Sequence, residues 1–312
     1  MRVAVVHANP ESARHWRDVL AAQLSEARVE IWDDSYRGDA DYAVGRPPAE
    51  FFSQQPRLRA VFSIGAGVEN ILANTVLRPA LPIIRLEDAG MGEQMADYCL
   101  YDVLRWMCRR DEYARQQQAG VWRELPIEAR TQWPIGLFGL GVLGRQMATA
   151  FAALGFPVNA YARSAHNEDP RITCFASSGG AGDFAAFMRA TRVLIILAPL
   201  TPATQDYFDS SRLALLPRAS YVINVARGGL LVDEALLELL DSGHLAGAAL
   251  DVFREEPLSP EHPFWAHPKI RITPHAAAAT LIGPSAIQIA EKIRRLQRNE
   301  PISGVVERER GY

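Results

Sequence analysis

An arginine, a glutamate and a histidine each lie just after a short apolar run in the second half of the chain. They are Arg227, Glu256 and His275. In open α/β sheets, ligands bind beyond the carboxyl ends of the strands, and polar residues that follow strands gather there. The sequence therefore predicts that these side chains line one ligand-binding crevice.

The three side-chain types together could reduce a 2-oxo acid. The guanidinium of Arg227 can pair with a carboxylate through two hydrogen bonds. An imidazole such as that of His275 can donate a proton to a carbonyl oxygen, because histidine side chains titrate near neutral pH. A carboxylate bonded to the ring, as Glu256 could be, favours its charged form and orients it. Singly, a structural histidine and a solvated arginine or glutamate are the plainer interpretations, so the hypothesis rests on the joint pattern.

A glycine pattern of the form G-x-G-x-x-G lies between a predicted strand at residues 135–138 and a predicted helix at 145–154. Its glycines are Gly139, Gly141 and Gly144. The first glycine would permit a tight turn, the second would let the backbone approach a pyrophosphate, and the third would let helix and strand pack closely.

The start of that helix is suited to an anion. Backbone N–H groups near Val142 and Leu143 would face a bound pyrophosphate. Such a glycine pattern alone is weak evidence, but a second strand predicted at residues 157–161 completes the expected β-α-β unit. The combination favours a dinucleotide site.

The residues after the second strand bear on the choice of dinucleotide. An NAD site would place a carboxylate there to accept from the ribose 2′-hydroxyl, but the chain has Arg163 and Ser164, with no carboxylate until Glu168. Arg163 could grip a 2′-phosphate with its planar fork of donors, and Ser164 could add a hydroxyl. A solvated surface arginine is the alternative. On balance we expect NADPH, with NADH as the weaker cofactor.

Short β-branched or apolar runs alternate with helical patterns through most of the chain. We predict strands at residues 2–6, 29–32, 41–44, 60–64, 82–85, 135–138, 157–161, 193–197, 221–224 and 246–250. Helical patterns lie between several of them, for example at 11–24. This alternation predicts parallel sheets covered by helices, arranged as two α/β units.

Three longer helices stand out. One is predicted at residues 91–118, near the boundary between the units, and a last one at about 277–298. Another lies between the strands at 221–224 and 246–250, where Asp233 can cap the amino end and Gly243 can close the carboxyl end.

Composition excludes several classes of protein. The chain has 312 residues, 48% of them hydrophobic and 22% charged, which suits a soluble protein with two domains. With a formal charge of −3, the chain has no excess of basic residues that would predict binding to nucleic acid or to an anionic membrane. The amino-terminal apolar run is too short for a signal peptide. The uncharged stretch around residues 146–162 contains Gly155 and Pro157, which favours helix, turn and strand over a membrane span.

The cysteines are few and unpaired in pattern. Cys99, Cys108 and Cys174 form no CxxC motif and have no histidine at metal-ligand spacing. We therefore expect no metal site, buried and inert thiols, and a cytoplasmic protein.

At this point the chain resembles the D-isomer-specific 2-hydroxyacid dehydrogenases over nearly its full length. The matching segments are residues 139–144, 198–202, 224–228, 251–257 and 273–275. Within that family it is most similar to the bacterial glyoxylate/hydroxypyruvate reductase A group. The strings that carry this closer likeness are residues 63–68, 85–95 and 310–312.

The resemblance implies reduction of glyoxylate to glycolate and of hydroxypyruvate to D-glycerate. His275 would protonate the carbonyl oxygen while hydride arrives from the nicotinamide, Arg227 would bind and polarise the substrate, and Glu256 would complete the set. The backbone N–H groups of Ala66 and Gly67 would hold the substrate carboxylate.

The resemblance also implies an architecture. Two Rossmann-like, doubly wound domains are expected: a flavodoxin-like substrate domain at residues 1–98, completed by 276–312, and a dinucleotide-binding domain at 99–275. Pro199, Ala226 and Asp251 would belong to the cofactor site, Asp251 near the nicotinamide carboxamide. Family members are typically homodimers joined through the cofactor domain and its long first helix.

Two departures leave the preferred acid open. Alanines follow His275, where some relatives have Ser or Gly, and the loop at residues 44–48 lacks the Trp expected in the closest group. Arg46, in that loop, either adds positive charge or is a solvated loop residue. A dehydrogenase for another small D-2-hydroxy acid is one alternative, and a dinucleotide-sensing binding protein is another. Formate dehydrogenases are disfavoured, because they carry Gln at the position of Glu256.

Overall fold

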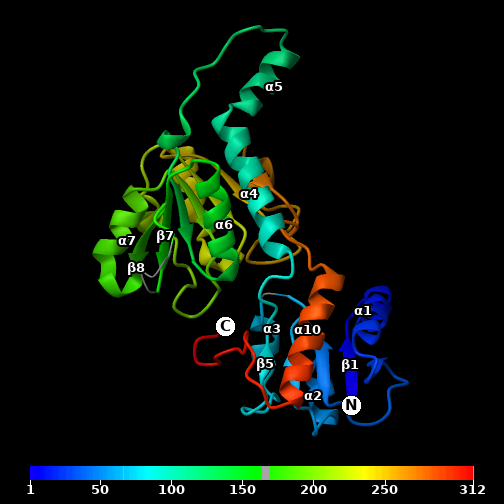
Figure 1. The fold of residues 1–312 in the computed structure, drawn as a ribbon. Helices are drawn as coiled ribbons and strands as arrows, with labels where there is room; N and C mark the ends of the chain where they lie inside the picture. The colour runs from blue at the N-terminus through cyan, green and yellow to red at the C-terminus, as the bar shows by residue number, and fades with distance from the viewer. Residues whose placement is uncertain (66, 164–168, 312) are drawn as a thin grey trace. The chain divides into compact units, whose positions relative to one another are not determined.

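The computed structural model describes residues 1–65, 67–163 and 169–311. These residues form two compact units (Figure 1). Unit 1 comprises Met1–Met91 and Thr280–Tyr312, and unit 2 comprises Gly92–Ala279. The boundary expected after residue 98 thus lies within the first helix of unit 2, and the one expected after residue 275 lies a few residues before the second crossing.

Unit 1 is built on a five-stranded sheet with strand order β2-β1-β3-β4-β5, in which all paired neighbours are parallel. The strands are β1 (Arg2–Val6), β2 (Arg28–Ile31), β3 (Tyr42–Gly45), β4 (Ala60–Phe62) and β5 (Ile83–Ile84). The helices are α1 (Pro10–Gln23), α2 (Ala49–Gln54), α3 (Glu69–Leu72) and α10 (Ile282–Gln297). Helix α10 packs against α1, so the last helix of the chain completes the first unit.

The segment after α10 is tied to the edge of the unit 1 sheet. Val305 forms an antiparallel bridge with Ile84, and the N–H of Val306 donates to the carbonyl of Ile83 at 2.9 Å. Lys292, buried on α10, pairs with Glu87 at 2.9 Å. This pair and the bridge attach the carboxyl-terminal segment to the strand edge.

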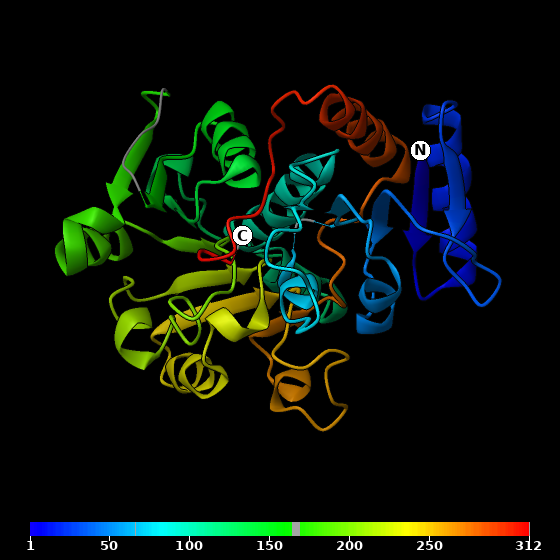
Figure 2. The ribbon, with the colours of Figure 1, turned by 90° about the horizontal axis from the view of Figure 1, so that it is seen from below.

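Unit 2, coloured from cyan to orange in Figure 2, contains a parallel sheet. The sheet has seven strands in the order β12-β11-β10-β9-β6-β7-β8. The strands are β6 (Ile135–Phe138), β7 (Val158–Ala162), β8 (Ile172–Ala176), β9 (Val193–Ile196), β10 (Ser220–Asn224), β11 (Leu245–Leu250) and β12 (Ile270–Ile272). The α-helices are α4 (Met91–Met107), α5 (Arg110–Gln118), α6 (Val142–Ala153), α7 (Gly180–Arg189), α8 (Ser210–Leu213) and α9 (Asp233–Asp241). The 3-10 turns are η1 (Arg130–Gln132), η2 (Ser177–Gly179), η3 (Gly228–Leu230) and η4 (Pro263–Ala266).

Helices cover both faces of the unit 2 sheet. Side chains of α4 and α6 form one buried cluster with Leu137 and Ile195, whereas those of α7, α8 and α9 form another with Phe138 and Ile196. Successive residues of a strand point to opposite faces, so each central strand needs apolar residues throughout. This explains the continuous apolar runs and confirms the expected doubly wound parallel-sheet fold.

The predicted helix at residues 91–118 is wrong in one respect, because it is two helices. Arg109 adopts a left-handed conformation with φ 52° and separates α4 from α5. Its guanidinium contacts both carboxylate oxygens of Glu112, each at 2.8 Å. No Gly or Pro marks this break, so periodicity alone runs through it.

Other element boundaries also differ from expectation. Helix α10 begins at Ile282, with Pro284 in its first turn, where proline is tolerated. The residue at the N-cap position of α9 is Val232, whose side chain makes no capping hydrogen bond. Asp233, which we expected there, instead has its carboxylate oxygen Oδ1 3.6 Å from Nε of Arg254. Gly243, with φ 70°, does follow the end of that helix as predicted.

The short strands β8 and β12 were not predicted. They lie at the two edges of the sheet, where burial on both faces is incomplete and polar residues interrupt the apolar run. Edge strands of this kind give a weak sequence pattern.

The remaining sequence expectations concern membrane spans and thiols. Residues 146–162 form the end of α6, a turn at Gly155 and strand β7, as predicted. No helix in the described part of the chain has both the length and the apolar character to cross a membrane. Cys99 is buried, but Cys174 is only partly buried and Cys108 is exposed just after α4, so the expectation of uniformly buried thiols is wrong.

Gly45 should be required for the stability of unit 1. It has φ 134°, and a Cβ there would lie 1.9 Å from the carbonyl oxygen of Val6. Gly45→Ala should lower the free energy of unfolding by about 2–4 kcal/mol, because strand β3 must move away from β1. Urea unfolding measures this. Gly283→Ala, with nothing within 4 Å of its new Cβ, is the matched control and should change stability by less than about 1 kcal/mol. Equal midpoints for both variants would contradict the prediction.

Candidate active site

A buried carboxylate organises the turn that carries His275. Asp251 follows β11 and is 1% exposed. Its carboxylate accepts from the Thr273 hydroxyl at 2.6 Å and from the N–H groups of Ala276 and Ala277 at 2.7 and 3.0 Å. Its backbone carbonyl accepts from the N–H of His275 at 2.8 Å. The turn after β12 is therefore fixed against the end of β11.

The imidazole of His275 contacts Glu256. The distance between His275 Nδ1 and Glu256 Oε2 is 2.8 Å, and the other carboxylate oxygen accepts from the N–H of Phe253 at 3.0 Å. Both partners are about half-exposed, with 48% and 37% of their side-chain surfaces accessible. Because Nδ1 is engaged, Nε2 is the ring nitrogen left to meet a ligand. The structure thus brings together two of the residues singled out in the sequence.

The electrostatic environment keeps Glu256 ionised. Partial burial acts to raise the pKa of its carboxyl group. The hydrogen bonds from His275 and from the N–H of Phe253, together with the nearby charges of His275 and Arg227, outweigh burial and lower that pKa below its ordinary value.

Arg227 lies on the turn after β10. The Asn224 side chain holds this turn by donating to the Arg227 carbonyl at 3.0 Å and accepting from the N–H of Ala226 at 3.1 Å. A Cβ at Gly228 would lie 1.9 Å from the carbonyl carbon of Phe253. The turn with Arg227 is therefore pressed against the segment that leads to Glu256, and glycine is needed for this approach.

The glycine pattern has the geometry expected of a dinucleotide loop. Gly139 has φ 117°, and its added Cβ would lie 2.8 Å from the backbone nitrogen of Ala198. A Cβ at Gly144 would lie 2.3 Å from the Gly139 carbonyl oxygen, so helix α6 can approach β6 only without a side chain there. At Gly141 nothing lies within 4 Å. That space, at the amino end of α6, is open to a ligand.

The other residues expected at the cofactor site lie at strand ends of the same sheet. Val142 and Leu143 begin α6, Pro199 follows β9, and Ala226 follows β10. The carboxyl ends of parallel strands meet at one edge of a sheet, so these positions share an edge with the glycine loop and Asp251.

The residues after β7 are only partly described. Arg163 is exposed, and its carbonyl accepts from the Ser177 hydroxyl at 3.4 Å. Ser164 lies outside the described residues. The position of Arg163, directly after β7, is the one at which a Rossmann fold contacts the adenosine ribose.

The loop expected to hold the substrate carboxylate lies after β4 in unit 1. The hydroxyl of Ser63 accepts from the N–H of Gly65 at 3.2 Å and donates to the Gly67 carbonyl at 3.1 Å. Thr280 donates to the carbonyl of Ile64 at 2.7 Å. The N–H of Gly67 has no acceptor among the residues that the structure describes, and Ala66 lies outside them.

Sequence reasoning missed Tyr98, which supports the His275 turn through Thr273. The hydroxyl of Thr273 lies 2.7 Å from that of Tyr98 on α4, and it donates to Asp251. Burial raises the pKa of Tyr98 well above its ordinary value. The segment with Thr273 was recognised, but Tyr98 stands in an apolar helix pattern, where nothing distinguishes it from a core residue.

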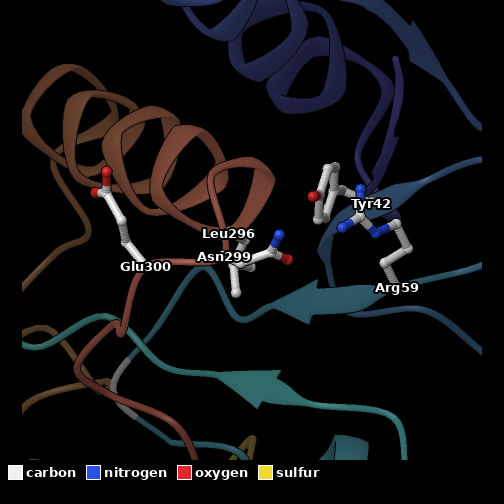
Figure 3. Close-up of a pocket in the computed structure, with 5 residues that line it drawn as sticks. All are labelled: Tyr42, Arg59, Leu296, Asn299 and Glu300. Atoms are coloured by element: carbon white, nitrogen blue, oxygen red, sulfur yellow. The ribbon is translucent and has the colours of Figure 1, made fainter.

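A cavity of about 330 Å³ lies elsewhere in unit 1 (Figure 3). It is lined by Tyr42, Arg59, Leu296, Asn299 and Glu300. Tyr42 begins β3 and Arg59 precedes β4, so the cavity lies at the amino ends of the strands. None of the candidate catalytic or cofactor residues lines it. Among the described residues, no cluster of three or more His, Cys, Asp and Glu side chains is arranged to hold a metal ion.

Comparison with known proteins agrees with the resemblance seen in the sequence. The family model for the NAD-binding domain of D-isomer-specific 2-hydroxyacid dehydrogenases matches residues 100–277. A protein of Klebsiella pneumoniae named glyoxylate/hydroxypyruvate reductase A is 43% identical over 305 residues, which cover 96% of each chain.

Solved structures match over nearly the whole chain. A D-isomer-specific 2-hydroxyacid dehydrogenase from Xanthobacter autotrophicus, in complex with NADPH and MES, is 33% identical with a TM-score of 0.92 and covers 99% of both chains. An NADPH-dependent glyoxylate/hydroxypyruvate reductase from Sinorhizobium meliloti, in complex with NADP and sulfate, is 32% identical with a TM-score of 0.91 and covers 100% of this chain and 99% of the other. The chain belongs to the D-isomer-specific 2-hydroxyacid dehydrogenase family.

Proposed function

We propose that the protein uses NADPH to reduce glyoxylate to glycolate and hydroxypyruvate to D-glycerate. The observation that carries the proposal is the 2.8 Å contact between the His275 imidazole and the Glu256 carboxylate, with the charge of Arg227 acting on the same carboxylate. Support comes from the relatives named for this activity, one 43% identical and another solved with NADP.

In the proposed reaction, His275 is the general acid. Its Nδ1 is held by Glu256, so Nε2 donates the proton to the carbonyl oxygen of the 2-oxo acid. When bound, the reduced nicotinamide supplies the hydride, which adds to the carbonyl carbon. One hydride and one proton together convert the carbonyl to an alcohol, which is primary in glycolate and secondary in D-glycerate. The Glu256 carboxylate stabilises the charged imidazole before transfer and fixes the ring orientation.

Substrate binding is assigned to Arg227 and to the loop after β4. Arg227 binds the carboxylate and polarises the carbonyl, as a planar guanidinium can. The N–H groups of Ala66 and Gly67 hold the carboxylate, which fits the N–H of Gly67 having no acceptor among the described residues. Unit 1 would then be the substrate-binding domain.

The cofactor is assigned to unit 2. The open space at Gly141 and the backbone N–H groups of Val142 and Leu143 suit a pyrophosphate. Gly139 and Gly144 give the loop its shape. Further along the same edge, Pro199 and Ala226 would line the site and Asp251 would lie near the carboxamide, in addition to its hydrogen bonds within the His275 turn. Arg163 and Ser164 would meet the 2′-phosphate of NADPH.

We also propose that the protein is a homodimer. Helix α5 extends away from the unit 2 sheet, and an irregular segment returns from it (Figure 1). On this segment Trp122 and Ile127 are 98% and 95% exposed. Large apolar side chains at such exposure favour burial against a partner, and a second copy is the partner expected of this family. A cytoplasmic location is proposed on the sparse cysteines, none of which is paired.

Loss of the general acid should nearly abolish turnover. His275→Ala should lower kcat for glyoxylate by about two to four decades, because the proposed proton donor is lost. The decline of NADPH absorbance after glyoxylate is added measures this. His15→Ala, an exposed histidine on α1, is the control and should behave as wild type. Unchanged kcat in His275→Ala would remove that residue from the role. Tight cofactor binding without turnover by the wild type would favour the dinucleotide-sensing alternative.

Removing the carboxylate beside the imidazole should change the pH dependence of reduction. Against partial burial, the hydrogen bonds from His275 and from the N–H of Phe253 hold the pKa of the Glu256 carboxyl below its ordinary value, so the wild-type carboxylate should persist as pH falls and be lost only at acid pH. Glu256→Gln has no carboxylate to protonate, so it should lack this acid limb and reduce kcat by about one to two decades at pH values above that limb. A profile of kcat/KM against pH tests this. Wild-type kcat in Glu256→Gln, or the same acid limb in both proteins, would contradict it.

Arg163 should set the cofactor preference. Arg163→Ala should lower kcat/KM for NADPH about tenfold or more and leave that for NADH within about twofold, because only NADPH carries the 2′-phosphate. Parallel titrations of both cofactors at saturating glyoxylate measure the ratio. Arg189→Ala, at the end of α7, is the matched control for loss of one positive charge. If the ratio is unaltered, the assignment of Arg163 is wrong.

A further inference from the structure

The carboxyl edge of the unit 1 sheet carries an arginine that the proposed reaction does not use. Arg46 directly follows β3, and β3 pairs with β4, which precedes the loop at residues 63–67. A terminal guanidinium nitrogen of Arg46 lies 4.0 Å from the position that a Cβ of Gly65 would occupy. A positive charge therefore stands directly beside the loop proposed to hold the substrate carboxylate.

The backbone that carries Arg46 is held in place. The N–H of Arg46 donates to the Val6 carbonyl at 3.1 Å, and Gly45 before it fits only without a side chain. Pro47, which is buried, and Pro48 follow directly and restrict the next two backbone positions. The side chain thus starts from a fixed point at the end of β3.

The guanidinium of Arg46 has no acidic partner in the described part of the chain. Other arginines of unit 1 do: Arg2 pairs with Glu30 at 2.8 Å, and Arg294 pairs with Glu26 at 2.8 Å. Arg46 is exposed and makes no side-chain hydrogen bond or ion pair among the residues described. An unpaired, planar donor group at the edge where a parallel sheet binds ligands suits a carboxylate.

We propose that Arg46 binds a second carboxylate of the substrate, so that the same site reduces 2-oxo dicarboxylic acids. The proposal rests on the proposed function: the loop with Gly67 holds the carboxylate next to the carbonyl, and Arg46, beside that loop in the same unit, receives the one at the far end of the acid. Glyoxylate and hydroxypyruvate have no such group. When either of these acids is bound, the Arg46 guanidinium remains solvated.

The test compares acids that differ only at the far end. Oxaloacetate and 2-oxobutyrate have the same chain, with a carboxylate in one where the other has a methyl group, and 2-oxoglutarate and 2-oxovalerate form a second such pair. In the wild-type protein with NADPH, kcat/KM for oxaloacetate should exceed that for 2-oxobutyrate. Arg46→Ala should lower this ratio about tenfold, and Arg46→Lys, which keeps the charge but loses the fork, should lower it less.

Ionic strength provides a second readout. Salt screens an exposed charge pair, so the ratio for the wild type should fall as sodium chloride is raised, whereas the ratio for Arg46→Ala should stay flat. Arg59→Ala removes another exposed arginine of unit 1, at the amino end of β4, and is the matched control (Figure 3). It should leave the ratio at the wild-type value.

The possible failures are distinguishable. If the wild type reduces glyoxylate but Arg46→Ala keeps the wild-type ratio, Arg46 is a solvated residue and this inference alone is wrong. If kcat/KM falls equally for both acids of a pair, Arg46 acts on the shared carboxylate or on the loop, which also overturns it. If the wild type reduces no 2-oxo acid at all, the proposed function fails and the assignment of Arg46 fails with it.

Discussion

The buried carboxylate of Asp251 determines where the candidate acid of the reaction can stand. His275 has φ 53°, a left-handed conformation that costs a residue with a side chain about 1–2 kcal/mol. Against that cost, Asp251 accepts hydrogen bonds from the Thr273 hydroxyl and from two backbone N–H groups of the turn. Hydrogen bonds to a charged group each contribute about 1.5–3 kcal/mol. These hydrogen bonds offset the conformational cost, so the left-handed turn persists and presents the imidazole to Glu256.

Close backbone packing at glycines shapes the rest of the candidate site. Gly228 lets the Arg227 turn touch the backbone at Phe253, and Gly144 lets α6 touch the loop at Gly139. In each case one hydrogen atom in place of a methyl group allows two backbone segments to meet. Charged side chains from separate strand ends are brought close in this way, although they are far apart in the sequence. The parallel sheet places the ends of its strands along one edge. The glycines let the backbone segments at that edge approach one another closely.

The sequence predicted the central strands well because burial on both faces demands continuous apolar runs, as at residues 193–196. From residue types and from the rule that strand ends share an edge, it predicted that Glu256 and His275 lie in one crevice, and the structure brings the two side chains into contact. It did not predict the break at Arg109, whose left-handed turn has no Gly or Pro to mark it. Nor did it find Tyr98, because a single hydroxyl in an apolar helix pattern gives no sign of the Thr273 hydroxyl that it meets.

Unit 1 is made from two stretches of chain, with all of unit 2 between them. A ribosome therefore releases Met1–Met91 long before it makes Thr280–Tyr312, the stretch that provides α10 and the bridge to β5. Until then the apolar surface of α1 that α10 covers stays open to water, whereas unit 2 can close on itself as one continuous stretch. The domain synthesised first is thus the last to be finished: all five strands of its sheet lie in the first stretch, within Arg2–Ile84, but its helix α1 lacks the cover of α10 until the other domain has been translated.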